Sequence, residues 1–368
     1  MNKILSIWFK QYDKVLDGGG QENIRCFNAL CKAVGKKNVE SMFIHPLGEK
    51  KSKIERIADA YYFIQDMHNG IRPRHIKKII EVAPRYDCIF LGTSLFGVIA
   101  KALKEEGYRG RIITHFHNIE SIYYDAYIPK LLPGRSVVVN CAAHNDRMSC
   151  IFSDKITVLT KRDNDFLEKN YGRKADIILP IALDDNLGNE DANTLINKSY
   201  KTSHRPQCVF IGSNFPANAE GLMWFVREVL PNVDIDFKVI GKNMDMLQQK
   251  EKELSNIEVH SSVLDLKPYF LNTDFIILPI FKGSGMKVKT CEALMYGRNI
   301  LATSEAVEGY DIDMTKAGAL CNTAKEFIEA IQRFSNIQVS RFNEYSRQSF
   351  LDKYSTESTD LLFNELLS

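Results

Sequence analysis

The chain lacks the features that mark several large classes of protein. Its 48 basic and 46 acidic residues nearly balance, which gives a formal net charge of +2 over 368 residues. A dedicated nucleic-acid-binding protein needs a strongly basic surface, so we expect no nucleic acid among the partners. No apolar run is long enough to cross a bilayer, and the apolar stretch at residues 4–9 is too short for a signal peptide core. We therefore expect a soluble protein, or at most a peripheral one.

The eight cysteines also lack any recognisable pattern. They form no Cys-x-x-Cys pair, and no group of cysteines and histidines has the spacing of zinc ligands. Several lie within apolar stretches, as Cys88 does before Ile89-Phe90-Leu91. Free, buried thiols are typical of a reducing compartment, so we expect a cytoplasmic location.

The chain is longer than one hydrophobic core usually supports. Short apolar segments typical of parallel strands alternate with amphipathic helical patterns, and the alternation resumes after a polar stretch. This pattern predicts an α/β fold with two Rossmann-like, doubly wound domains. The predicted divisions are an N-terminal domain (1–183), a linker or surface excursion (184–205), a C-terminal domain (206–337) and a C-terminal helical segment (338–368) suited to packing back on the first domain.

The most informative segment covers residues 278–297, where Gly283-Ser284-Gly285 joins a predicted strand to a predicted helix. Glycines let the main chain approach phosphate oxygens, and the amides at a helix N-terminus attract anions. Lys287 adds a positive charge in the first helical turn, and Glu292 lies where a carboxylate can accept hydrogen bonds from ribose hydroxyls. The glycines alone also fit an ordinary tight turn. Val288 replaces the third glycine of a dinucleotide fingerprint, which argues against a dehydrogenase.

Three further segments accompany this one in a fixed order. They are Val209-Phe210-Ile211-Gly212-Ser213-Asn214-Phe215-Pro216-Ala217-Asn218 followed by Leu222-Met223-Trp224-Phe225, Ser262-Val263-Leu264-Asp265-Leu266-Lys267-Pro268-Tyr269, and Ala302-Thr303 followed by Glu308-Gly309. Together with Gly-Ser-Gly-Met-Lys, Glu-Ala-Leu and Tyr-Gly within 283–297, they resemble retaining glycosyltransferases of the GT-B fold, family four (glycosyl transferases group 1). The resemblance covers nearly all of residues 208–310.

The resemblance implies an enzyme with its donor in a cleft between two facing domains. The reaction would move a hexosyl unit from a nucleotide diphosphate sugar to a glycan or lipid-linked glycan acceptor, with retention and without a metal or other cofactor. Surface polysaccharide biosynthesis is the implied setting. The resemblance places the backbone of Gly283, Ser284, Gly285 and Met286 on the donor, Lys287 on its diphosphate, Glu292 on its ribose, Val263 beside its base and Asn214 at the cleft.

The first half contributes two further candidates. Gly18-Gly19-Gly20 lies between a predicted strand and a predicted helix, and the family uses a glycine-rich loop there. Gly19 and Gly20 are therefore candidate donor-binding residues, although a flexible turn fits equally well. The run His117-Asn118-Ile119-Glu120 resembles the first-domain motif, in which a histidine contacts donor sugar or acceptor. His117 thus joins Lys287 and Glu292 as a candidate catalytic residue, with Asn118 and Glu120 on the acceptor side.

A metal site is an alternative for part of this segment. His115 and His117 share one face of a continuing strand, but the sequence identifies no matching third ligand. We therefore expect no metal.

Two departures from the family pattern affect the expected site. Ser284 stands where many members carry the first of two glutamates eight positions apart, and no basic pair follows Gly212. Neutralisation of the diphosphate would then depend more heavily on Lys287. Two alternatives stay open: a sugar-nucleotide epimerase of the same fold, and a non-catalytic partner subunit of a glycosyltransferase. Ser284 favours the partner subunit, whereas Lys287 and Glu292 count against it.

Basic residues gather at 50–53 and again at Arg72, Arg74, Lys77 and Lys78. Such a run is usually a solvated helix face. It also suits contact with anionic lipid, which a lipid-linked acceptor would require. Peripheral contact at the inner face of the cell membrane is therefore a further expectation.

Overall fold

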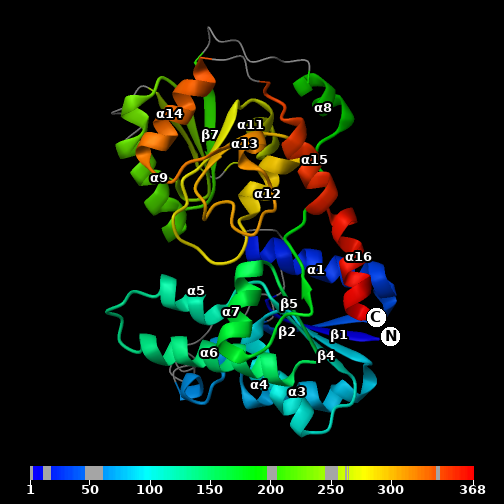
Figure 1. The fold of residues 1–368 in the computed structure, drawn as a ribbon. Helices are drawn as coiled ribbons and strands as arrows, with labels where there is room; N and C mark the ends of the chain where they lie inside the picture. The colour runs from blue at the N-terminus through cyan, green and yellow to red at the C-terminus, as the bar shows by residue number, and fades with distance from the viewer. Residues whose placement is uncertain are drawn as a thin grey trace. The chain divides into compact units, whose positions relative to one another are not determined.

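The computed structural model describes residues 3–10, 18–45, 61–196, 205–244, 256–261, 263, 265–336 and 340–368. Its contacts divide the chain into two compact units (Figure 1). The first unit contains Met1–Ile181 and Thr359–Ser368, and the second contains Ala182–Ser358.

The first unit is built on a six-stranded sheet in which all strands run parallel, in the order β2-β1-β3-β4-β5-β6. The strands are β1 (Ile4–Lys10), β2 (Val39–His45), β3 (Cys88–Leu91), β4 (Arg111–Phe116), β5 (Lys155–Val158) and β6 (Ile177–Ile178). The helices include α1 (Gly18–Val34), α3 (Pro73–Val82), α4 (Gly97–Glu105), α5 (Glu120–Tyr127), α6 (Arg135–Phe152) and α7 (Lys161–Tyr171).

Helices cover both faces of this sheet, because successive side chains of a strand point to opposite sides. On β1, Ile4 and Trp8 join a core with residues of α1 and of the last helix, α16 (Thr356–Leu367). Leu5 and Ile7 join a second core with residues of α3 and α4. This arrangement confirms the predicted doubly wound α/β architecture.

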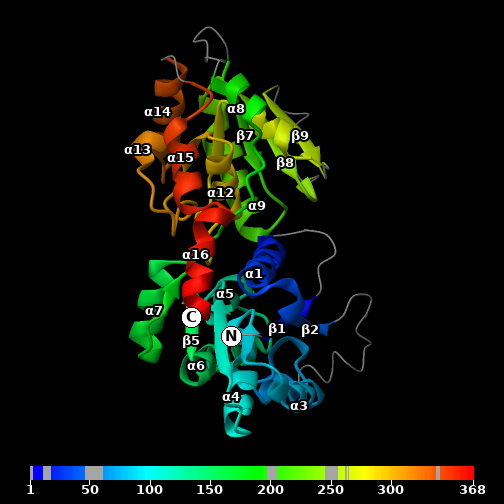
Figure 2. The same cartoon turned by 90° about the vertical axis from the view of Figure 1, so that its right-hand side faces the viewer.

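The C-terminal helix α16 packs on the first unit, beside α1 (Figures 1 and 2). Phe363 and Leu366 are buried in the α1 core, and Lys32 of α1 forms an ion pair with Asp360. The preceding helix α15 (Glu344–Lys353) belongs to the second unit, so the transfer to the first unit occurs at Thr359 and not at residue 338.

The second unit repeats the architecture with a parallel sheet in the order β12-β11-β10-β7-β8-β9. The strands are β7 (Gln207–Ile211), β8 (Asp236–Gly241), β9 (Ile257–Ser261), β10 (Phe275–Leu278), β11 (Asn299–Ala302) and β12 (Gly318–Leu320). The helices include α8 (Asn189–Ile196), α9 (Pro216–Glu228), α11 (Lys267–Leu271), α12 (Val288–Met295), α13 (Met314–Ala317) and α14 (Ala324–Ser335). The segment 184–205, predicted as a linker, therefore belongs to this unit and contains α8.

Aromatic side chains fix the helices to this second sheet. The ring centroids of Phe225 in α9 and Phe327 in α14 lie 5.6 Å apart, and Phe225 also packs 5.0 Å from Phe237 of β8. Phe270 of α11 stacks at 4.7 Å on Tyr296, which follows α12. The last of these contacts packs the end of α12 against α11, and α12 carries the candidate residue Glu292.

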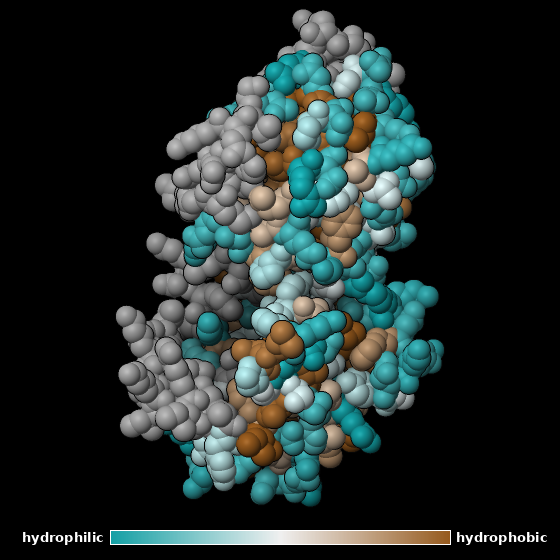
Figure 3. Space-filling model, turned by 90° about the vertical axis from the view of Figure 1, so that its left-hand side faces the viewer, coloured by the Kyte–Doolittle hydropathy of each residue, from teal (hydrophilic) through white to brown (hydrophobic). Residues whose placement is uncertain are grey.

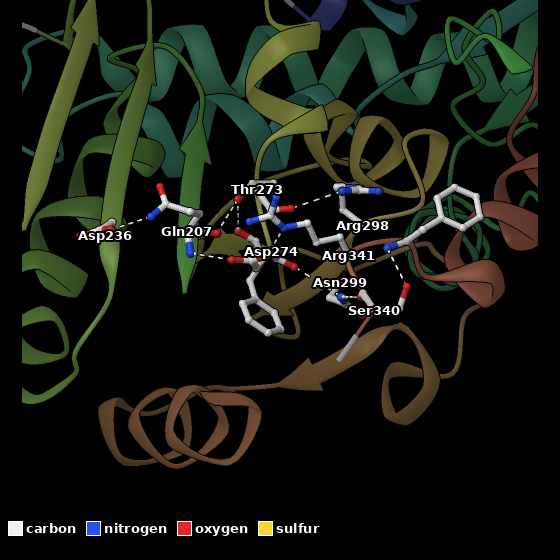
Figure 4. A network of polar contacts seen from close by, with 10 residues as sticks. Gln207, Asp236, Thr273, Asp274, Arg298, Asn299, Ser340 and Arg341 are labelled. Atoms are coloured by element: carbon white, nitrogen blue, oxygen red, sulfur yellow. Dashed lines mark hydrogen bonds and ion pairs between the residues drawn. The ribbon is translucent and has the colours of Figure 1, made fainter. Parts of the chain in front are cut away.

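A buried polar network ties the amino ends of the central strands together (Figure 4). The Asp274 carboxylate, just before β10, accepts hydrogen bonds from the Gln207 backbone N–H at 2.8 Å and from the Arg341 Nε at 2.5 Å. Arg298 is fully buried and donates to the Tyr296 and Thr273 carbonyl oxygens. Asp274 and Arg298 are buried and hydrogen-bonded, and the network lies at the edge opposite the candidate loops, so we assign it a structural role.

Each sheet has one position where the strand order reverses. In the first unit it lies between β1 and β3, and in the second between β7 and β10. Open α/β sheets bind ligands outside the carboxyl ends of the strands at this position. These two reversal points are therefore the expected ligand-binding positions of the two units.

Candidate functional site

The loop after β10 carries the Gly-Ser-Gly turn of the second unit. Gly285 has φ of 62°, a conformation that favours glycine. A Cβ on Gly283 would lie 2.7 Å from the Lys287 Cε atom, so glycine lets Lys287 fold back over the loop. Helix α12 begins at Val288 with Lys287 as its N-cap. Lys287 thus precedes the first helical turn, in which the sequence had placed it.

The Lys287 ammonium is already compensated within this unit. Its Nζ donates to the Gly285 carbonyl oxygen at 2.8 Å and to the Glu305 Oε1 at 2.7 Å. The Lys287 and Glu305 side chains are only 11% and 17% exposed. The sequence-based expectation placed Lys287 on a donor diphosphate and did not include Glu305, which follows β11. An incoming phosphate must therefore share Lys287 with Glu305 or displace it.

Glu292 lies on α12 and is half-buried. Burial raises the pKa of its carboxyl to about 7, although the charge of Lys289 opposes this rise. Within the part of the chain that the structure describes, no hydrogen bond reaches this carboxylate. A carboxylate that has lost water without gaining donors favours a ligand that brings hydroxyl groups.

Lys289 belongs to this site, although the sequence-based expectations assigned it no role. Its Nζ donates to Asn218 Oδ1 of α9 and lies 5.1 Å from the centroid of the Phe210 ring in β7. Burial, reinforced by the charge of Lys287, lowers the pKa of Lys289 to about 7, while Glu292 acts in the opposite direction. The signal available in the sequence is the Lys-x-Lys pair just before Glu292.

The remaining candidates of the second unit lie at different depths. Met286 is buried, Ser284 is half-buried and Asn214 is exposed. The backbone N–H of Asn214 donates to the Lys242 carbonyl oxygen at 2.9 Å. Val263 is half-buried and follows β9, two strands from β7. At the usual strand spacing it lies about 10 Å from the reversal point, a span comparable with a nucleoside.

In the first unit, His117 and Glu120 are brought together at the carboxyl end of β4. His117 Nε2 lies 3.4 Å from Glu120 Oε1, and Thr93 Oγ1 donates to the same oxygen at 3.3 Å. Burial and then the neighbouring Asp146 raise the pKa of Glu120 to about 8, whereas burial and then His115 lower the pKa of His117 to about 4. At neutral pH both groups are therefore uncharged.

The uncharged pair suits hydrogen bonding to a sugar hydroxyl better than charge stabilisation, because a neutral imidazole offers one donor and one acceptor. Asn118 lies between the two and is half-buried. The grouping of His117, Asn118 and Glu120 at one strand end is thus observed. The structure assigns them no ligand.

A separate buried cluster surrounds His115. Its Nδ1 lies 2.7 Å from Thr157 Oγ1, and its Nε2 lies 3.2 Å from Glu22 Oε1. Glu22, Cys26 and His115 could together hold a metal ion, since their ligand atoms lie within 4.8 Å of one another. This trio differs from the predicted His115–His117 pair, for which no third ligand was found.

The Glu22 carboxylate of this cluster already has a cationic partner in Arg25. Although burial opposes ionisation, Arg25 and His115 hold the pKa of Glu22 well below its usual range. Arg25 Nε donates to Glu22 Oε2 at 3.0 Å, and burial raises the pKa of the Cys26 thiol. The guanidinium opposes a metal cation at this place, and the raised thiol pKa disfavours the thiolate that a metal would bind.

The glycine triplet does not form the predicted loop. Gly18, Gly19 and Gly20 form the first turn of α1 and not a loop between strand and helix. The buried face of α1, with Cys26 and Leu30 in the core, stabilises the helix by more than the cost of about 1 kcal/mol for each glycine. The connection before the helix, at residues 11–17, lies outside the described residues.

Comparison with solved structures identifies the fold. The HepE protein of Anabaena, crystallised in complex with UDP, aligns over 99% of both chains with 13% identity and a TM-score of 0.66. Sucrose-phosphate synthase of Thermosynechococcus elongatus aligns over 100% of this chain and 98% of its own, with 12% identity and a TM-score of 0.68. The fold is GT-B. Trehalose 6-phosphate synthase of Burkholderia multivorans shares it, with 12% identity, coverage of 100% and 96%, and a TM-score of 0.62.

Sequence comparisons concern part of the chain. Residues 205–336 match the family described as Glycosyl transferases group 1. An uncharacterised 44.6 kDa protein from the cps region of Klebsiella pneumoniae is 24% identical over 161 residues, which cover 39% of this chain and 42% of that protein. The matched stretch thus spans less than half of this curated relative. The family match and the GT-B fold together support a group 1 glycosyltransferase.

Within the GT-B fold the predicted residues form two groups. Residues of the 283–287 loop and of α12 gather near the β7–β10 reversal of the second unit, and His117 with Glu120 gathers in the first unit. No helix in the described part of the chain is both long and apolar enough to cross a bilayer.

Proposed function

We propose that this chain is a glycosyltransferase that transfers a hexosyl unit from a nucleotide diphosphate sugar to a glycan or lipid-linked glycan, with retention and without a metal. The observation that carries the proposal is the convergence of a glycine loop, two lysines and an unsatisfied carboxylate at the β7–β10 reversal. The group 1 family match over residues 205–336 includes all of these residues.

Other findings agree with a nucleotide sugar as the donor. Structures of the Anabaena HepE protein are described as complexes with UDP, with UDP and glucose, and with UDP-glucose. The Klebsiella relative is placed in a cps region, which favours surface polysaccharide biosynthesis. We include a location at the cytoplasmic face of the membrane in the proposal.

The proposed mechanism assigns electrostatic work to the second unit. The departing diphosphate gathers negative charge, and the amides of the 283–287 loop with the Lys287 ammonium stabilise it. On donor binding, the Lys287 ammonium exchanges its contact with the Glu305 carboxylate for a contact with a phosphate oxygen. The ammonium therefore has an anionic partner both before and after binding. Glu292 accepts hydrogen bonds from the ribose hydroxyls. For the neutral His117 we propose a part in orienting donor sugar or acceptor by hydrogen bonding.

Contact with an anionic membrane surface is a further part of the proposal. Of the basic residues on which it was predicted, those at 50–53 lie outside the described residues, and Arg72, Arg74, Lys77 and Lys78 lie in α3 or just before it.

A separate apolar surface supports the proposal. The connection between α5 and α6 exposes Leu131 to 96% and Leu132 to 52%, next to the exposed Lys130. Ile122 and Val137 on the flanking helices are also more than one third exposed. Figure 3 shows apolar side chains gathered on the side of the first unit where α5 and α6 lie in Figure 1. A lipid-linked acceptor is presented at such a surface.

The proposal is tested by incubating the purified chain with nucleotide diphosphate sugars. A transferase releases nucleoside diphosphate slowly through hydrolysis and faster when a crude glycolipid acceptor is added, and a chelator leaves the rate nearly unchanged. Lys287→Met should lower this rate by orders of magnitude, while the control Lys282→Met, which removes an exposed charge of the same loop, should not. Interconversion of the sugar without an acceptor would instead identify an epimerase. Absence of binding to every nucleotide sugar would favour a non-catalytic partner subunit.

A further inference from the structure

A lysine and a glycine from different elements meet at the carboxyl end of β7. A Cβ on Gly212, the residue that follows β7, would lie 2.9 Å from the Lys289 Nζ of α12. The same Nζ lies above the Phe210 ring and donates to Asn218 Oδ1. The ammonium group is therefore held at the reversal point between β7 and β10, where open α/β sheets bind their ligands.

The contacts of Lys289 fit an ammonium that binds an anionic ligand better than one that stabilises the fold. Its hydrogen bond goes to a neutral amide, and in the described part of the chain no carboxylate lies within ion-pair distance of it. Lys289 is half-buried, and an ammonium that has lost water without gaining such a partner is costly. Lys287 repels it, and Glu292 on the same helix attracts it. An anionic ligand would remove this cost.

We propose that Lys289 is a second phosphate-binding residue of this site, which holds the diphosphate of a nucleoside diphosphate at the end of β7. Lys287 would hold the same diphosphate from the loop after β10. The residues after Gly212 are Ser213 and Asn214, so α12 supplies here the positive charge that the β7 loop lacks. This inference rests on the proposed function, because it adds a contact to the same donor site.

The proposal has a protonation signature. The groups that face Lys289 are Lys287 before α12, Glu292 on α12, Asn218 of α9 and Phe210 of β7. Burial lowers the pKa of Lys289 to about 7, so at pH 8 the empty site holds it mainly as the neutral amine. A bound diphosphate favours the ammonium form, and binding at pH 8 therefore takes up a proton. Glu292, with its pKa raised by burial to about 7, is already mainly ionised at that pH.

The test is calorimetric titration of the full chain with UDP, GDP, ADP and dTDP at pH 8, in two buffers of different ionisation enthalpy. We expect Lys289→Met to weaken binding of the preferred nucleotide roughly 10- to 100-fold, the range of one charge-assisted hydrogen bond. Proton uptake should fall by up to about one proton. The melting temperature of the unliganded variant should stay unchanged or rise, because methionine fills the same space without a buried charge. A purely structural role for Lys289 predicts a lower melting temperature instead.

Two further variants keep the test sharp. Lys282→Met removes an exposed lysine that pairs with Glu220, and should change affinity by less than about twofold. Gly212→Ala displaces the Lys289 ammonium without removing it, and should also weaken binding. Unchanged affinity and proton uptake in Lys289→Met and Gly212→Ala would overturn this inference while the proposed function stands. If the wild-type chain binds no nucleoside diphosphate, the proposed function and this inference both fail.

Discussion

The ion pair between Lys287 and Glu305 allows the structural and ligand-binding roles of Lys287 to be separated. Lys287→Met leaves the Glu305 carboxylate, only 17% exposed, without the ammonium that lies 2.7 Å away. Loss of one partner of a fully buried pair costs about 3–5 kcal/mol. The remaining exposure of both side chains lowers our expectation to about 1–3 kcal/mol in the free energy of unfolding.

The double variant Lys287→Met with Glu305→Gln should recover most of this stability, because no unbalanced charge remains. Its affinity for nucleoside diphosphates should nevertheless stay low. The lost phosphate contact is a charge-assisted hydrogen bond worth about 1.5–3 kcal/mol, which corresponds to a roughly 10- to 100-fold weaker affinity.

The assays are urea unfolding for stability and calorimetric titration for affinity, on wild type, both single variants and the double variant. Lys282→Met is the matched control, since Lys282 is exposed and lies on the same loop. Wild-type affinity in the double variant would refute the phosphate-binding role of Lys287. Wild-type stability in Lys287→Met would refute the reasoning about the ion pair.

Three other predictions follow from the described residues. Burial raises the folded-state pKa of Glu120 to about 8 from its ordinary value of 4.5, so the folded chain holds a proton that the unfolded chain has released. The free energy of unfolding should therefore fall as the pH rises from about 4.5 to about 8. Glu120→Gln should reduce this pH dependence by up to about 1.4 kcal/mol per pH unit in unfolding titrations. An unchanged pH dependence would show that Glu120 is not protonated. Arg341→Met leaves Asp274, which is 2% exposed, without its ion-pair partner. The free energy of unfolding, measured in urea, should fall by about 3–5 kcal/mol. A loss below about 1 kcal/mol would contradict the structural role of this network. Replacement of Leu131 and Leu132 by glutamate should reduce sedimentation with phosphatidylglycerol vesicles by at least about tenfold without a change in melting temperature; unchanged sedimentation would remove the membrane contact from the proposal.

The sequence predicted the architecture well because the fold depends on regular patterns. Alternating apolar runs and helical periodicities predict two doubly wound sheets, and strands such as Cys88–Leu91 and Phe275–Leu278 appear where their apolar runs lie. The glycine triplet at 18–20 is predicted as a loop because it lies between a predicted strand and a predicted helix, where the family uses a glycine-rich loop, but the structure places it in the first turn of α1. Packing of the α1 face outweighs the low helix propensity of glycine, and such tertiary packing is not visible in a local pattern.

The candidate site was predictable only where its residues are close together in the sequence. Lys287 and Glu292 lie within one motif, and the structure keeps them on one loop and helix. The lysines contact residues that are distant in the sequence. Glu305 lies 18 residues from Lys287, and Asn218 lies 71 residues from Lys289, with Gly212 farther still. No periodicity links these residues to the lysines. The burial that lowers the pKa of Lys289 also depends on these distant contacts.

The central claim is that the 283–287 loop and the start of α12 bind the diphosphate of a nucleotide. Amide hydrogen exchange of the full chain, with and without a saturating nucleoside diphosphate, tests this claim most directly. We predict ligand-dependent protection of peptides covering residues 283–292 and 210–218, and loss of that protection in Lys287→Met. Tight binding that protects other segments and leaves these peptides unchanged would contradict the account.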